Sequence, residues 1–115
     1  MQVGLVLLKI DWRFRLYLQV FVPTGIAVLT GPNRYGTLRV PYVIHAVGPN
    51  YWEFEGNESE ADRLLRSAYK ASLEHAKNHR LAAVGFSLLA AGVFRGRRSI
   101  HHILNIAVQT NYKGL

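Results

Sequence analysis

Residues 81–107 read LAAVGFSLLAAGVFRGRRSIHHILNIA, and this stretch decides the fold of the chain. It begins with an apolar run that does not alternate with polar residues, a pattern typical of a strand buried on both faces. The run ends in a small, glycine-punctuated loop at residues 90–96, where a backbone can turn sharply and approach a ligand closely. Beyond the loop, Ser99 is a candidate N-cap for a helix that continues to Ala107. The stretch therefore predicts strand, glycine loop and helix in that order.

The glycine loop is a candidate phosphate site. A strand end followed by a helix N-terminus leaves backbone N–H groups unpaired, and the helix dipole attracts negative charge to them. Arginines at positions 95, 97 and 98 lie in or beside the loop. The predicted ligand-binding residues are Ala90, Ala91, Gly92, Val93, Phe94, Arg95 and Gly96. A glycine that merely turns the chain into a helix would give the same local pattern, so a loop without a ligand stays open as an alternative.

The length and composition limit the classes of protein to which the chain can belong. A chain of 115 residues forms one domain at most, and because 50% of the residues are hydrophobic we expect a folded core. The net charge of +7 favours an anionic partner such as a nucleotide, a nucleic acid or an acidic surface. The absence of cysteine excludes disulfides, thiolate metal sites and a cysteine nucleophile, and it is typical of a reducing compartment, cytoplasmic or nuclear.

The sequence does not indicate a membrane protein or a metalloprotein. Its apolar runs are shorter than the roughly 20 residues that span a bilayer. Charged residues interrupt the apolar start of the chain, so no signal peptide is predicted. Glu74, His75 and His79 resemble a set of metal ligands, but they fall on the charged face of a predicted helix and are interpreted as solvated surface. We expect no cofactor, no metal and no membrane partner.

Three further strands are predicted from periodicity. Residues 10–22 alternate apolar and polar side chains, which indicates a long, half-buried strand. Residues 26–29 form a short apolar run between turn residues and predict another strand. Residues 40–47, VPYVIHAV, predict a buried strand, and His45 within it is interpreted as a core histidine.

The clearest helix is predicted over residues 57–77. Asn57 and Glu60 have the spacing of a capping box, and acidic residues that include Asp62 crowd the first turn, where the helix dipole favours them. From residue 40 the order is thus strand, helix, strand, glycine loop and helix. This is a βαβ crossover, which makes its two strands parallel and places helices on the sheet. Ligands bind beyond the carboxyl ends of such strands, and residues 48–50 and the glycine loop lie at these ends.

Four segments resemble macro domains, a family that binds ADP-ribose. Residues 43–49, VIHAVGP, resemble the family's VIHxVGP strand, and residues 83–94, AVGFSLLAAGVF, resemble its strand and phosphate loop. Residues 23–30, PTGIAVLT, and the helical residues 64–73 match further segments in the same order. The resemblance implies an α/β fold, a three-layer α/β/α arrangement of a mixed sheet with helices on both faces.

The resemblance also implies a role for the glycine loop. Backbone amides around Ala91, Gly92, Val93 and Phe94 would hold the diphosphate of ADP-ribose and the adjoining distal ribose, and Phe94 would pack against that ribose. The predicted partner is accordingly ADP-ribose or an ADP-ribosylated protein.

The chain departs from the family's pattern in places. The family carries an NAAN-like loop and a glycine run before the TG segment, and in its hydrolytic members these position the attacking water. Residues 1–22 contain neither, so they are predicted to be an atypical strand-like segment ahead of a partial macro-like domain at residues 23–115. Arg95 stands where the family usually has glycine, and Ala90 where serine is common. We therefore expect an incomplete fold, as in a gene fragment, a misplaced start or a diverged variant.

Four functional interpretations stay open at this stage. The first is a module that binds ADP-ribose or a derivative of it. The second is an enzyme of the same family that removes ADP-ribose or acetyl groups from ADP-ribosyl adducts, for which the sequence identifies no catalytic residue. The third is a basic protein that binds nucleic acid or poly(ADP-ribose) weakly through positive charge, which added salt would weaken steeply. The fourth is a remnant without a stable site.

Overall fold

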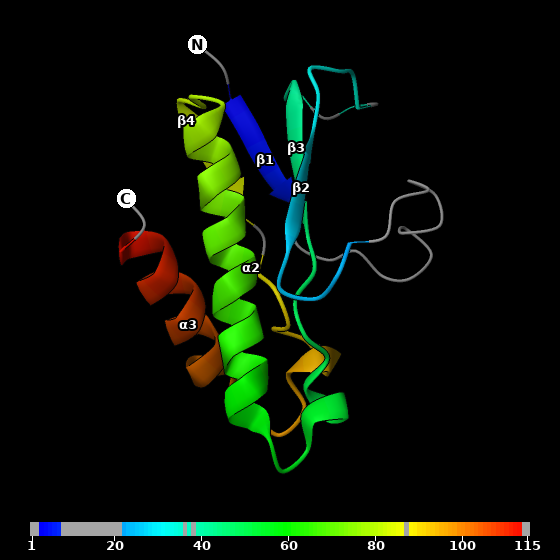
Figure 1. Ribbon diagram of the computed structural model, residues 1–115, viewed down its shortest axis with the longest axis vertical. Helices are drawn as coiled ribbons and strands as arrows, with labels where there is room; N and C mark the ends of the chain where they lie inside the picture. The colour runs from blue at the N-terminus through cyan, green and yellow to red at the C-terminus, as the bar shows by residue number, and fades with distance from the viewer. Residues whose placement is uncertain (1–2, 8–21, 36, 38, 87, 114–115) are drawn as a thin grey trace.

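The computed structural model describes residues 3–7, 22–35, 37, 39–86 and 88–113. These residues form a four-stranded sheet with helices packed beside it (Figure 1). The strands are β1 (Val3–Leu7), β2 (Ala27–Thr30), β3 (Tyr42–Ala46) and β4 (Ala83–Phe86). The α-helices are α2 (Glu58–Asn78) and α3 (Ile100–Lys113), and the 3-10 turns are η1 (Tyr51–Phe54) and η2 (Val93–Arg95).

The sheet is mixed, with the strand order β2-β3-β1-β4. β1 pairs in parallel with both β3 and β4, whereas β2 pairs with β3 in the antiparallel sense. The two strands of the predicted βαβ unit, β3 and β4, therefore run parallel as expected, but β1 lies between them. The predicted α/β class with a mixed sheet is confirmed.

The predicted strands near residues 26–29 and 40–47 are present as β2 and β3. The alternating strand predicted over residues 10–22 falls almost entirely outside the described residues. β1 falls within residues 1–22, which were predicted to be strand-like, but the alternation pointed to residues 10–22 and the interior place of β1 in the sheet was not predicted. Its partners are far away in the sequence, so local periodicity did not indicate its place.

The helix predicted over residues 57–77 is α2, shifted by one residue at each end. Asn57 is the N-cap residue, but its side chain makes no capping hydrogen bond, so the predicted capping box is wrong. The carboxylate of Glu60 instead accepts hydrogen bonds from the guanidinium of Arg63, one turn further along the helix. This pairing leaves Glu60 unable to reach back to the N-cap.

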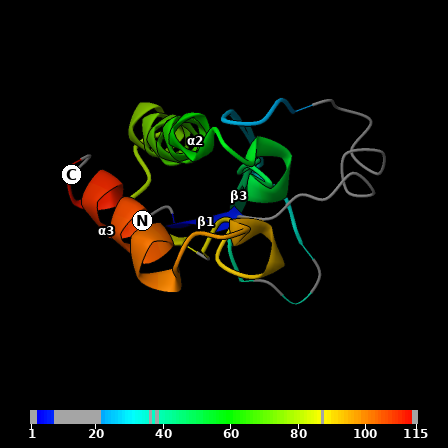
Figure 2. The ribbon, with the colours of Figure 1, turned by 90° about the horizontal axis from the view of Figure 1, so that it is seen from below.

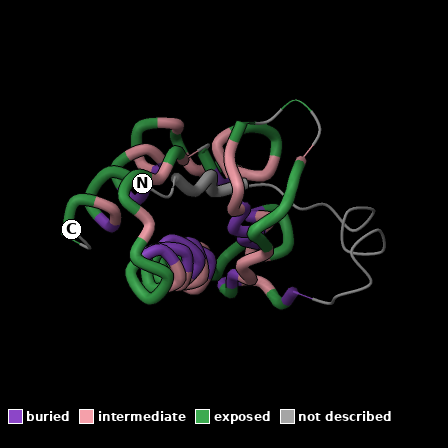
Figure 3. Tube along the Cα trace, turned by 90° about the horizontal axis from the view of Figure 1, so that it is seen from above, coloured by how far each residue is buried: buried purple, intermediate pink, exposed green. Residues whose placement is uncertain are grey.

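The core lies between α2, α3 and the sheet. One face of α2 is buried along its length, at Ala61, Asp62, Leu65, Ala68, Tyr69, Ser72, Leu73 and Ala76. Figure 3 shows this buried face directed towards the strands. α3 lies beside α2 and buries Ile103, Ile106 and Ala107 (Figure 2). Full burial of one such large aliphatic side chain stabilises a fold by about 1.5–3 kcal/mol.

His45 is a core residue, as predicted. Its side chain is 2% exposed, and its Nε2 atom lies 2.8 Å from the hydroxyl of Thr30 on the neighbouring strand. Burial lowers the pKa of His45, so the ring is neutral at neutral pH. Glu74 on α2 and His79 at its C-cap are exposed as predicted. His75 is half-buried, and its Nε2 atom lies 2.9 Å from the carbonyl oxygen of Ala27.

β4 differs from its prediction as a strand buried on both faces. Ala83 and Gly85 are exposed, and Val84 and Phe86 are half-buried. The physical reason is position: β4 is the last strand of the sheet, and among the described residues β1 is its only pairing partner. No helix within the described part of the chain is both long and apolar enough to cross a membrane.

Candidate functional site

The glycine loop leaves the carboxyl end of β4 and packs against the turn that follows β3. η1 and η2 are in contact at this end of the sheet (Figure 1). The indole Nε1 of Trp52 in η1 donates a hydrogen bond of 2.9 Å to the carbonyl oxygen of Val93 in η2. Asn50 holds the start of η1, because its side-chain oxygen accepts from the amide of Trp52 at 3.2 Å. The two predicted strand-end segments therefore form one surface.

The carbonyl oxygens of Ala91, Gly92 and Val93 in the loop accept hydrogen bonds from within the protein. The oxygen of Ala91 accepts from the Arg95 guanidinium at 3.1 Å, and that of Gly92 accepts from the Arg95 amide at 3.1 Å. The oxygen of Val93 accepts from Trp52. Within the described residues, the N–H groups of Ala91, Gly92 and Val93 donate to none of the protein's own acceptors. A loop whose acceptors are bound and whose donors are open suits a negatively charged ligand.

The loop is also sterically open. Gly92 and Val93 are exposed, the latter with 78% of its surface accessible. A Cβ atom added at Gly92 would meet nothing within 4 Å. On the inner side, Leu89 is 1% exposed and its amide donates to the hydroxyl of Tyr69 at 3.0 Å. The loop is thus attached to the core through Leu89 and reaches solvent at Gly92.

The connection from the loop to α3 differs from the prediction. Ser99 is the N-cap as expected, since its hydroxyl accepts from the amide of His102 at 3.1 Å. The loop does not open directly into that helix, however, because the single turn of η2 comes first. The dipole of a helix acts mainly within its first turn. The open amides of the loop are therefore separated from the N-terminus of α3 by η2.

The three arginines beside the loop each have a partner inside the protein. Arg98 donates to the carboxylate of Asp62 at 3.0 Å, and Arg95 folds back onto the carbonyl of Ala91. Arg97 lies 3.7 Å from the carboxylate of Glu55, and both of these side chains are largely exposed. The arginine cluster thus contributes to holding the loop as well as to its positive charge.

Asp62 is a residue whose importance was not predicted. Its side chain is only 8% exposed and accepts hydrogen bonds from Tyr51 at 2.5 Å and Arg98 at 3.0 Å, and His102 Nε2 lies 2.9 Å from it. Burial and the neighbouring carboxylate raise the pKa of Tyr51. We call Tyr51, Asp62, Arg98 and His102 the Asp62 cluster. It joins η1, α2 and α3 around the glycine loop.

A signal for this cluster was present in the sequence. Asp62 lies between Ala61 and Leu65 on the apolar face of the predicted helix, where a carboxylate would be buried without a cation unless another segment supplied one. From the sequence, Asp62 is predicted only as one of the acidic residues in the first turn of the helix. Its position on the apolar face of the helix was the better indication that another segment supplies it with a partner.

Gly96 closes the loop against η1. Its backbone has φ +60°, a conformation that side chains other than glycine rarely adopt. A Cβ atom at this position would lie 2.8 Å from the Cβ of Tyr51. Gly96 is thus required for close packing, whereas Gly92 is free of such contacts. No group of three or more histidine, aspartate or glutamate side chains suited to a metal ion occurs among the described residues.

Comparisons with known proteins agree with this architecture. The sequence matches the family model described as Macro domain over residues 14–100. Over 72 residues it is 44% identical to a macro domain-containing protein of Caldanaerobacter subterraneus and 42% identical to one of Cupriavidus necator. Each match covers 63% of this chain and 38% of the relative, so the chain spans less than two fifths of the length of these curated relatives.

A similar fold is found among solved structures. A mutant of the Oceanobacillus iheyensis macrodomain with ADPR superposes with a TM-score of 0.71 at 21% sequence identity. The superposition covers 97% of this chain and 70% of that one.

Proposed function

The chain belongs to the macro domain family, and from that premise we propose that it binds ADP-ribose, free or attached to a protein, at the glycine loop. The amides of Ala91, Gly92 and Val93 hold the diphosphate, and Phe94 packs against the adjoining ribose. One observation carries the proposal: these three amides are open, while the carbonyl oxygens of the same residues are bound within the protein.

This pattern favours a diphosphate for a physical reason. A diphosphate presents several anionic oxygens and no donors, so it needs adjacent N–H groups and is repelled by exposed carbonyl oxygens. Arg95 and Trp52 engage the carbonyls and leave the donors accessible. Because these hydrogen bonds exist before a ligand arrives, little ordering of the loop is needed on binding.

We propose binding, and we assign no catalytic role among the described residues. Asp62 and His102 form a titratable pair, with His102 Nε2 2.9 Å from the carboxylate of Asp62, as part of the Asp62 cluster. The hydrogen bonds of Asp62 and His102 within the Asp62 cluster give both residues a structural role. Because the chain has no cysteine, we expect it to act in a reducing compartment, the cytoplasm or the nucleus.

Calorimetric titration with ADP-ribose tests the proposal, with AMP and ADP as reference ligands. We expect saturable heat with ADP-ribose, and we expect Gly92→Val to weaken its affinity about tenfold or more because the valine side chain occupies the space in front of the amides. The thermal midpoint of this variant should stay close to that of the parent, since a Cβ at Gly92 meets no other atoms.

Gly56→Asn is the matched control. Gly56 is an exposed glycine with open space around it, and asparagine tolerates its positive φ. This variant should bind ADP-ribose as the parent does. The proposal fails if ADP-ribose at millimolar concentration gives no more heat than AMP. It also fails if binding is lost on adding salt and is insensitive to Gly92→Val, because a diffuse electrostatic site behaves in that way.

A further inference from the structure

One buried carboxylate connects the glycine loop with η1. The Oδ1 atom of Asp62 accepts a hydrogen bond of 2.5 Å from the Tyr51 hydroxyl, and its Oδ2 atom accepts one of 3.0 Å from the Arg98 guanidinium. Tyr51 belongs to η1, whereas Arg98 lies two residues beyond Gly96 at the end of the glycine loop. The two oxygen atoms of a single side chain therefore bind both segments that form the surface of the candidate site.

Backbone hydrogen bonds connect Arg98 to the open amides of the loop. The amide of Arg98 donates to the carbonyl oxygen of Arg95 at 3.1 Å, and the amide of Arg95 donates to that of Gly92 at 3.1 Å. Each such turn fixes the backbone dihedral angles of the residues that it encloses. The position of Arg98 thus constrains the direction in which the N–H groups at Gly92 and Val93 point.

The contact between Gly96 and Tyr51 is a second connection. A Cβ atom at Gly96 would lie 2.8 Å from the Cβ of Tyr51 and 3.2 Å from its carbonyl carbon, so the loop and η1 approach one another closely. Tyr51 is 1% exposed, and its hydroxyl is bound to Asp62. A shift of Tyr51 would therefore move the loop. Asp62 holds the loop in two ways, through Arg98 and through Tyr51.

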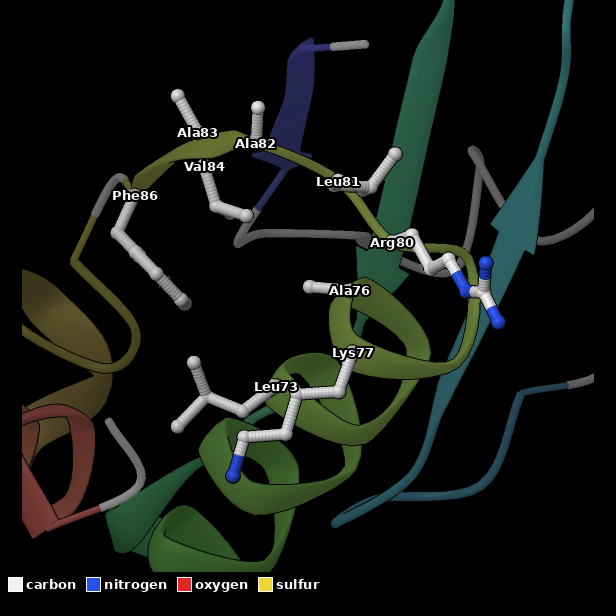
Figure 4. Close-up of a pocket in the computed structure, with 9 residues that line it drawn as sticks. All are labelled: Leu73, Ala76, Lys77, Arg80, Leu81, Ala82, Ala83, Val84 and Phe86. Carbon is white, nitrogen blue, oxygen red and sulfur yellow. The ribbon is translucent and has the colours of Figure 1, made fainter. Parts of the chain in front are cut away.

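The other end of α2 packs differently. An apolar pocket of about 540 Å³ lies there between α2 and β4, and the side chains of Leu73 and Phe86 point towards one another across it (Figure 4). Apolar contacts are not directional, so they do not hold a neighbouring segment at one angle. The charged hydrogen bonds of Asp62 are directional, and they lie at the end of α2 near the glycine loop.

We propose, resting on the ADP-ribose binding proposed above, that Asp62 is a positioning residue: it does not contact the ligand and holds the glycine loop in the conformation that binds it. Its side chain is only 8% exposed. Because Asp62 is an anion, its charge alone repels a diphosphate, and removal of that charge would by itself strengthen binding. Positioning has the opposite consequence, because a loop that must be ordered when the ligand arrives binds more weakly.

Calorimetric titration of the 115-residue chain and its Asp62 variants with ADP-ribose separates the two effects. Asp62→Ala should weaken the affinity about tenfold or more. Asp62→Asn should bind within about threefold of the parent, since its side-chain oxygen accepts from Arg98 and its amide group donates to the Tyr51 hydroxyl. Both variants remove the same negative charge, so a difference between their affinities reports on the position of the loop.

Arg98→Ala and Arg97→Ala form a second matched pair, which tests the same connection if Asp62→Ala does not fold. Both variants remove one positive charge from neighbouring positions. Of the two arginines, Arg98 is bound to Asp62, whereas Arg97 lies 3.7 Å from the exposed carboxylate of Glu55. Arg98→Ala should weaken the affinity about tenfold, and Arg97→Ala no more than about threefold. Arg98→Ala should fold, because Tyr51 still donates to Asp62.

Amide signals in nuclear magnetic resonance spectra distinguish a failure of this proposal from a failure of ADP-ribose binding. Without ligand, the signals of Ala91, Gly92 and Val93 should shift in Arg98→Ala and stay near their parent positions in Arg97→Ala. This measurement does not require a ligand. If the parent chain does not bind ADP-ribose, the proposed function fails, and the amide shifts still report whether Arg98 and its acceptor hold the loop.

Four outcomes would overturn the proposal. The first is unchanged or tighter binding by folded Asp62→Ala, which would leave charge as the main influence of this residue. The second is an equal loss of affinity in Asp62→Ala and Asp62→Asn. The third is an equal loss in the two arginine variants, which would indicate attraction by positive charge without positioning. The fourth is an absence of amide shifts in Arg98→Ala.

Discussion

The two halves of α2 are stabilised in different ways. Near its N-terminus, Asp62 is buried among Tyr51, Arg98 and His102, and these contacts join the helix to η1 and to α3. Towards its C-terminus, Leu73 and Lys77 border the apolar pocket beside β4. The same helix is therefore fixed by charged hydrogen bonds at the end near the glycine loop and is incompletely covered at the other end.

This difference shows which end of α2 is held in one position by directional contacts. Hydrogen bonds to a buried carboxylate require particular partners at particular angles, so they place the glycine loop in one position relative to the helix. Apolar contacts are not directional. The C-terminal half of α2 can therefore pack against further side chains without loss of a hydrogen bond. The proposed ligand site lies at the first end.

The largest effect is expected from Asp62→Ala. Loss of the carboxylate leaves the Tyr51 hydroxyl and the partly buried Arg98 guanidinium without their acceptor, and the free energy of unfolding should fall by about 3 kcal/mol. Urea unfolding followed by circular dichroism measures the loss. A loss below about 1 kcal/mol would show that the Asp62 cluster is not what holds this end of α2.

A matched pair of leucines on α2 compares the two halves directly. Leu65 is fully buried, and Leu73 is 8% exposed and faces the pocket. Leu65→Ala should lower the free energy of unfolding by about 3 kcal/mol, whereas Leu73→Ala should lower it by about 1–2 kcal/mol, because fewer packing contacts are lost beside an existing space. Equal losses in the same unfolding measurement would contradict the difference between the halves.

Alkaline pH should loosen the end of α2 that carries the Asp62 cluster. Burial and Asp62 raise the pKa of Tyr51 above its ordinary value, so the folded state keeps the phenol protonated more strongly than the unfolded state does. This stability is fully present below about pH 10 and is lost as pH rises through the folded-state pKa.

Tyr51→Phe tests this dependence. The variant should lose about 1–2 kcal/mol at neutral pH because Asp62 loses a donor. It should also show a smaller fall in stability above about pH 10 than the parent. A residual fall is expected, since burial raises the pKa of Tyr69 as well. If the alkaline fall in thermal midpoint is unchanged in the variant, Tyr51 is not the group responsible.

The smallest effect is expected from Glu60→Gln. Glu60 and Arg63 form an ion pair on the outer side of α2, with 38% and 63% of their side chains exposed. Solvent screens such pairs, and we expect no measurable change in thermal midpoint. A clear loss of stability here would mean that the exposed side of the N-terminal half contributes as much as the buried Asp62 cluster.

Part of the candidate site followed from the sequence and part did not. Glycine punctuation after an apolar run located the loop, and its exposed Gly92 and open amides agree with a close approach of a ligand. The sequence did not indicate that η2 lies between the start of the loop and α3. The role of Asp62 was missed because its partners Arg98 and His102 lie 36 and 40 residues away.

The sequence alone determined the local features: the bounds of α2 and the start of α3, the strands β2 and β3, and the position of the glycine loop. These depend on side-chain periodicity and capping, which involve residues within a turn or two of one another. The tertiary structure alone decided that β1 lies between β3 and β4, that β4 is an edge strand, and that Asp62 is paired. Those features depend on which distant segments meet, and neither spacing nor propensity within a segment specifies that.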